Sequence, residues 1–165
     1  MTNSRWRRSL VRRMTAVATA CLLLALAGCE RYALDRQMEE LCKKDGGIKV
    51  YETVTLPPEM FDQNGDPFPG WRARPESLRL GTDYRVVREA VEIKQGDPLK
   101  GEGRLTRFHA KVVRNADNKI LGEGVLHARS GGDLIVVDHY SSKFCPSQLG
   151  DSGSVVLGVF QRGSK

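Results

Sequence analysis

The amino-acid sequence predicts an α+β fold, in which an N-terminal amphipathic helix packs on a four- or five-stranded antiparallel meander sheet. Apolar residues recur at helical spacing between Arg31 and Asp45. Strand-like stretches with only short turns between them then run from Tyr84 to Tyr140. Repeated helical segments between these strands are lacking, which argues against a parallel βαβ sheet.

Residues 1–28 have the pattern of an export signal. The first 14 residues hold five arginines and no acidic residue, and a run rich in small residues and leucine follows from Thr15 to Ala27. This run is shorter than the ~20 residues that a membrane-spanning helix needs. We therefore expect a cleaved leader rather than a transmembrane helix. The basic residues of the leader are Arg5, Arg7, Arg8, Arg12 and Arg13.

The leader ends in Leu26-Ala27-Gly28-Cys29, which resembles the lipobox of bacterial lipoproteins. The resemblance implies a diacylglyceryl thioether on Cys29, cleavage before it, and a palmitate-like acyl anchor in the cell envelope on the periplasmic side. Two or more acyl chains give stable membrane attachment, at ~0.8 kcal/mol per buried CH₂. Enteric lipoproteins kept in the inner membrane usually carry Asp where this chain has Glu30, so the outer membrane is favoured. The alternative is an ordinary secretory leader, with Cys29 as a disulfide partner.

Removing the leader changes the charge of the protein. The whole chain carries 26 Lys+Arg and 20 Asp+Glu, a net charge of +6, but the five leader arginines leave 21 basic residues and a net charge near +1. This excludes nucleic acid as an expected partner. The remaining 137 of the 165 residues, 29–165, are enough for a single small periplasmic domain.

The cysteines predict one disulfide. Cys21 leaves with the leader and Cys29 is the lipid site, so Cys42 and Cys145 remain. In an oxidising periplasm a disulfide between them is the simplest interpretation. A redox or metal pair is the alternative, but neither cysteine lies in a CxxC motif and no histidine is close to either in sequence.

The expected helix covers residues 31–45, with Leu34, Met38, Leu41 and Cys42 on its apolar side. Gly46-Gly47 ends it. Because almost no tether separates it from Cys29, the domain should lie close to the lipid headgroups. Arg31 and Tyr32 either contact that interface or simply begin the helix.

The strands follow in order. Ile48 to Leu56 alternates as a half-buried strand that ends at Pro57-Pro58. Residues 57–83 are a loop-rich insertion, with Phe61, Phe68 and Trp71 as packing anchors. The later strands are expected at Tyr84–Lys94, Arg104–Arg114, Lys119–Arg129 and Leu134–Tyr140, with one more short strand at Ser154–Phe160.

The chain resembles a family of small uncharacterised proteobacterial lipoproteins in three stretches. These are residues 41–54, Gly131-Gly132-Asp133-Leu134 and Cys145-Pro146. The resemblance covers most of the chain after the leader. It implies the lipoprotein class and the Cys42–Cys145 pairing. It transfers no catalytic residue, because the family has no assigned activity.

Gly150-Asp151-Ser152-Gly153 matches the core of the nucleophile motif of chymotrypsin-like proteases. Residues of the right types precede it in the order of a catalytic triad. However, the chain after the leader is too short for two barrels, and only 13 residues follow Ser152. We interpret the segment as a turn before a last strand. The residues that precede it are His109, His127, His139, Asp133 and Asp138.

A metal site is a second possibility. If Arg107 faces His127 across two paired strands, His109 faces Val125, and His109, His127 and Glu123 share a face that holds zinc-ligand types. Arg107, Lys111 and Arg129 share that face and repel a cation, so a solvated charged face is favoured. Asp62–Asp66 is set aside as a turn, because Pro67 and Ala73 replace residues that a calcium loop needs.

The sequence therefore predicts a membrane-anchored envelope lipoprotein, a non-catalytic structural or interaction module without a cofactor. Its expected partners are the membrane, through Cys29, and another envelope protein. The alternatives are a membrane-tethered serine hydrolase that uses Ser152, and a small-ligand or metal binder that uses His109 and His127.

Overall fold

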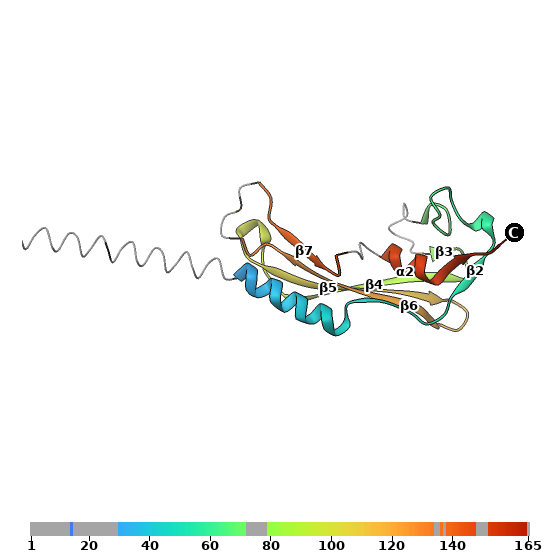
Figure 1. Ribbon diagram of the computed structural model, residues 1–165, viewed down its shortest axis with the longest axis horizontal. Helices are drawn as coiled ribbons and strands as arrows, with labels where there is room; N and C mark the ends of the chain where they lie inside the picture. The colour runs from blue at the N-terminus through green and yellow to red at the C-terminus, as the bar shows by residue number, and fades with distance from the viewer. Residues whose placement is uncertain are drawn as a thin grey trace, which may run out of the picture.

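The computed structural model describes Met14 and residues 30–71, 79–133, 136, 138–147 and 152–164. At residues 152 and 153 it describes the backbone alone. This part of the chain is α+β, as the sequence predicts. Three long strands run along an elongated molecule, with one helix beneath one end and another above the opposite end (Figure 1).

The centre of the sheet is an antiparallel meander of β4 (Tyr84–Lys94), β5 (Arg104–Arg114) and β6 (Ile120–Ser130). The six-stranded sheet has the order β1-β6-β5-β4-β3, with β7 also beside β6. Five strands lie along this path, which is the upper number expected, and in the described part of the chain β7 adds a sixth beside β6. The short strands are β1 (Gly47–Val50), β3 (Arg79–Leu80) and β7 (Ser142–Cys145).

The chain is helical over residues 30–45, and we call this element the 30–45 helix. It follows a stretch outside the described residues, so it is not at the N-terminus of the chain. The buried residues Leu34 and Met38 pack against Leu105 of β5, which confirms the predicted apolar side. Because side chains alternate along a strand, Leu105 shares its sheet face with Arg107 and His127. We call this the helix face.

The opposite sheet face is covered at the other end by α2 (Ser152–Val159). Its buried Val155, Val156 and Val159 join a cluster that includes Val112 and Leu121. A Cβ added to Gly124 would come within 2.5 Å of Val155 Cγ2, so this glycine lets the helix approach closely. We call this the α2 face.

The predicted strand over Ser154–Phe160 is wrong for most of its length. Residues up to Val159 are helical, and only Phe160 belongs to a strand, β8 (Phe160–Arg162), which pairs in parallel with β2 (Val54–Leu56). The apolar residues of this segment recur at positions 155, 156 and 159, which suits one side of a helix.

Two other strand expectations need correction. Ile48–Leu56 is two strands, because the backbone N–H groups of Tyr51 and Glu52 both donate to Leu121 O and end β1. The strand expected over Leu134–Tyr140 is absent at residues 136 and 138–140, and β7 begins only at Ser142. Asp133 explains the delay, because its carboxylate accepts from Ser141 N at 2.7 Å and closes a loop before the strand.

The insertion at 57–83 is described except for residues 72–78. It holds a 3₁₀ turn, η1 (Pro58–Met60), and a turn in which Asp62 accepts from Asn64 N and Asp66 N. Phe68 and Trp71 are buried in the α2-side core, as predicted. Phe61 is only half-buried and lies under the guanidinium of Arg162.

Candidate functional site

The predicted disulfide joins Cys42 and Cys145, whose Cα atoms are 5.8 Å apart. Two short strands share the outer edge of β6: β1 lies opposite residues 122–125, and β7 lies opposite residues 127–130. Cys145 stands opposite His127, at the point where the two strands meet. The bond therefore fixes the last turn of the 30–45 helix to this junction.

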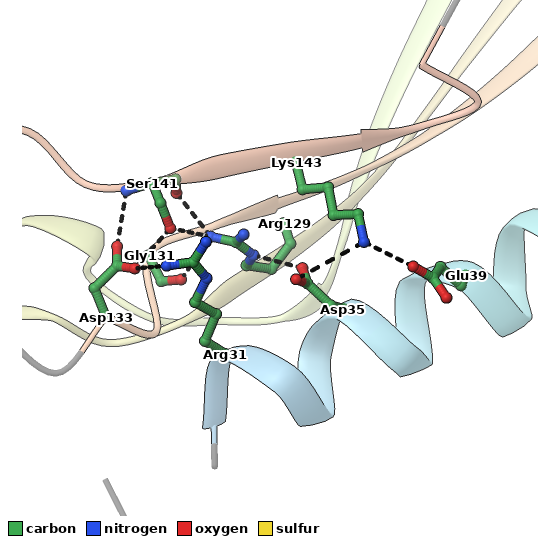
Figure 2. A network of polar contacts seen from close by, with 8 residues as sticks. All are labelled: Arg31, Asp35, Glu39, Arg129, Gly131, Asp133, Ser141 and Lys143. Carbon is green, nitrogen blue, oxygen red and sulfur yellow. Dashed lines mark hydrogen bonds and ion pairs between the residues drawn. The ribbon is translucent and has the colours of Figure 1, made fainter. Parts of the chain in front are cut away.

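A buried arginine connects the start of the same helix to the sheet (Figure 2). Arg129 of β6 has only 1% of its side chain exposed, and its Nε donates to Asp35 Oδ1 at 2.9 Å. Its Nη1 donates to the carbonyl oxygens of Gly131 and Ser141, at 3.0 and 2.9 Å. A buried charge requires this degree of pairing and hydrogen bonding.

Asp133 organises the loop beside Arg129. It accepts from the hydroxyl of Ser141 at 2.6 Å and pairs with Arg31 at 3.3 Å (Figure 2). The hydrogen bonds from Ser141 lower the pKa of Asp133 although burial opposes them, and Arg31 and Arg129 lower it further. The carboxylate is therefore held ionised between the loop and the helix.

Further along the helix, Lys143 of β7 donates to Glu39 at 2.7 Å, in an exposed pair. The Lys143 hydrogen bond lowers the pKa of Glu39, and that of Lys143 is raised in turn.

The turn between β4 and β5 packs against the first residues of the helix. Lys94 Nζ contacts Glu30 Oε1 at 2.5 Å and Gly103 O at 2.8 Å. A Cβ added to Gly103 would come within 2.1 Å of Leu34 Cδ1, and one added to Gly132 would lie 3.3 Å from the backbone of Arg31. Glycine at these positions lets the turn, the 131–133 loop and the helix start form one packed end of the domain.

The middle of the helix face carries a second buried polar group. His127 Nε2 lies 2.7 Å from Asp45 Oδ1, and Arg107 Nε donates to Asp45 Oδ2 at 2.8 Å. Burial alone would raise the pKa of Asp45, but the hydrogen bonds from His127 and Arg107 lower it. His127 Nδ1 is buried without a hydrogen-bond partner among the described residues.

The predicted register on this face is confirmed: Arg107 pairs with His127, and His109 pairs with Val125. His109 Nε2 lies 2.9 Å from Glu123 Oε2, and Tyr51 donates to the same carboxylate. The hydrogen bond from Tyr51 lowers the pKa of Glu123 against the effect of burial, and His109 lowers it further. His127, however, contacts Asp45 rather than this pair.

The three predicted zinc-ligand types therefore do not form one site. No group of three or more His, Cys, Asp or Glu side chains arranged for a metal ion occurs in the described part of the chain.

The remaining predicted site residues lie apart from one another. Cys29, Gly150 and Asp151 are outside the described residues, and Ser152 is the first residue of α2. His109 and His127 are on the helix face, whereas α2 packs on the opposite face. His139 is exposed, beside Asp138. No histidine of the described segments is thus brought to α2.

Sequence reasoning missed the Arg129 and Asp35 pair. The alternation of charged residues indicates Arg129 only as one cation of a solvated face, and this interpretation is wrong at Arg129 and His127, which are both buried. The available signal was Asp35, a carboxylate directly beside the apolar Leu34 of the helix.

In the described residues, no helix is long and apolar enough to cross a membrane. Comparison of the chain with protein-family models, with curated proteins and with solved structures finds no match.

Proposed function

We propose that this chain is a lipid-anchored protein of the bacterial envelope that acts without catalysis, by contact with another envelope protein. Cys29 carries the anchor. The domain behind it is a rigid platform, and the outer membrane is its favoured location.

The observation that carries the proposal is the attachment of the helix start to the sheet. Glu30, the residue after Cys29, contacts Lys94, and Arg31 and Asp35 pair with Asp133 and Arg129. Packed structure therefore begins one residue after the proposed lipid site. A lipid on Cys29 would hold this end of the domain at the headgroups.

The α2 face supplies a surface for a partner. Beyond the area that α2 covers, Phe108 of β5 is 41% exposed and Phe144 of β7 is 51% exposed. The half-buried Leu126 of β6 stands opposite Phe108, and Ala128, two residues further along β6, stands opposite Phe144, so these four apolar side chains lie on one face. Exposed, adjoining apolar side chains are typical of protein interaction sites.

Contacts on the helix face are consistent with a structural role for its histidines. His127 connects the end of the 30–45 helix to β6, and His109 connects β5 to Glu123. Each histidine is already hydrogen-bonded to a carboxylate that joins two elements.

The test is site-specific photo-cross-linking in living cells. A photoreactive amino acid at position 108 or 144 should give a reproducible cross-linked product with one envelope protein. The same amino acid in place of Glu40, an exposed residue of the 30–45 helix, should not give it. Absence of any reproducible product from 108 and 144 would contradict the interaction role.

A further inference from the structure

An exposed leucine stands at the tip of the turn that packs against the helix start. The turn contains the 3₁₀ helix η3 (Pro98–Lys100), in which Asp97 accepts from Leu99 N at 3.1 Å and Gly101 has a φ of 84°. Pro98 is buried beneath it, whereas Leu99 is 72% exposed. The turn is therefore held firmly while its apolar tip faces outward.

Tyr32 is exposed at the same end of the molecule. Its side chain is 74% exposed, and it lies in the first turn of the 30–45 helix. Gly131 connects this region to the turn, because a Cβ added there would meet Glu102 O at 2.4 Å and Pro98 Cα at 2.9 Å. Figure 1 shows the turn and the start of the helix side by side at this end, far from α2.

From this arrangement we propose that Leu99 and Tyr32 form a membrane-contact surface that enters the boundary between headgroups and acyl chains. The inference rests on the proposed function, because a lipid on Cys29 brings the bilayer to this end. Tyrosine suits the headgroup level of a bilayer, and leucine gains by leaving water. The domain would then be oriented on the membrane rather than free to rotate about its anchor.

The charges around the tip indicate which lipid is needed. Lys100 pairs with Asp97 at 3.3 Å, Arg31 with Asp133 at 3.3 Å, and Lys94 with Glu30 at 2.5 Å. These three cations already have acidic partners, and the exposed Arg36 lies one helical turn beyond Tyr32, so the contact should be mainly apolar in origin. It should form on zwitterionic phosphatidylcholine and should not require anionic lipid.

The experiment uses the full lipidated protein, reconstituted in phosphatidylcholine vesicles with brominated acyl chains, which quench nearby tryptophan. Leu99→Trp places the probe at the tip. Leu157→Trp is the matched control, because Leu157 is an exposed leucine of α2 at the other end. The parent protein, which keeps only the buried Trp71 once the leader with Trp6 is removed, gives the background emission.

We expect the emission of the Leu99→Trp protein to be strongly quenched and shifted to shorter wavelength, in vesicles with and without anionic lipid. The emission of the Leu157→Trp protein should be the same in brominated and in unbrominated vesicles. Mass measurement of the N-terminal peptide in the same sample separates the two proposals. A lipidated Cys29 with no quenching at position 99, or equal quenching at 99 and 157, would overturn the membrane-contact surface. An unmodified Cys29 would overturn the proposed function itself.

Discussion

Removal of the Asp35 carboxylate should destabilise the protein strongly, because it leaves the charge of Arg129 buried without its acidic partner. Arg129 is 1% exposed and Asp35 is 17% exposed, so water replaces little of the lost interaction. Breaking a buried pair from one side costs about 3–5 kcal/mol. Alanine at position 35 returns about 0.5 kcal/mol through its higher helix propensity. The expected net loss for Asp35→Ala is therefore about 3 kcal/mol in the free energy of unfolding.

The matched control is Glu39→Ala, four residues along the same helix. This variant also removes the acidic partner of a β-strand cation, Lys143, but both side chains of the Glu39–Lys143 pair are about half exposed. Exposed pairs contribute little to stability. The two variants thus remove the same kind of group from the same helix and differ mainly in the burial of the partner.

Urea unfolding followed by circular dichroism, with the disulfide intact, measures both variants. With a slope of about 2 kcal/mol per M, the Asp35→Ala midpoint should fall by ~1.5 M, and the Glu39→Ala midpoint should barely move. Equal shifts in the two variants would refute the reasoning, because burial would then not determine the cost.

Three further predictions concern other parts of the fold. Gly124→Ala should lose about 1–3 kcal/mol of stability, because the added Cβ would come within 2.5 Å of Val155 Cγ2; an unchanged thermal midpoint would contradict the close packing of α2. Replacing both Cys42 and Cys145 by serine should cost about 4–5 kcal/mol on the chain-entropy model, since the bond spans 103 residues; urea unfolding of the two proteins would show it. The pKa of Asp133 is lowered in the folded state, so its contribution is present above its unfolded pKa of about 3.9 and is lost as pH falls further. Asp133→Asn should therefore reduce the difference between the urea midpoints at pH 7 and pH 3, and an undiminished difference would contradict the role of this carboxylate.

The long strands could be predicted because their alternation and their short connections act locally. The turn after Arg114 determines the pairing of the next strand, and so Arg107 meets His127 as expected. The shift between Val112 and Val113 could not be foreseen, because it depends on how Leu121 enters the α2-side core. Cys42 was placed correctly by helical spacing together with the count of remaining cysteines.

Predictions failed where contacts distant in sequence override the local pattern. The Val155–Phe160 run is apolar enough for a strand, but packing against Gly122 and Gly124 favours a helix. Arg129 belongs to a strand in which charged residues alternate, a pattern that predicts exposure. Its burial depends on the ion pair with Asp35, which is 94 residues away in sequence. The period-2 pattern of a strand carries no information about which helix will cover it.

The most direct test of the central claim is the chemical state of Cys29. Cells that express the chain should incorporate labelled fatty acid into the protein, and the N-terminal peptide should begin at Cys29 with acyl chains attached. Cys29→Ser should abolish both the incorporation and the membrane association. A mature protein with an unmodified Cys29, or incorporation that persists in Cys29→Ser, would contradict the lipid anchor and, with it, the proposed placement of the domain at the membrane.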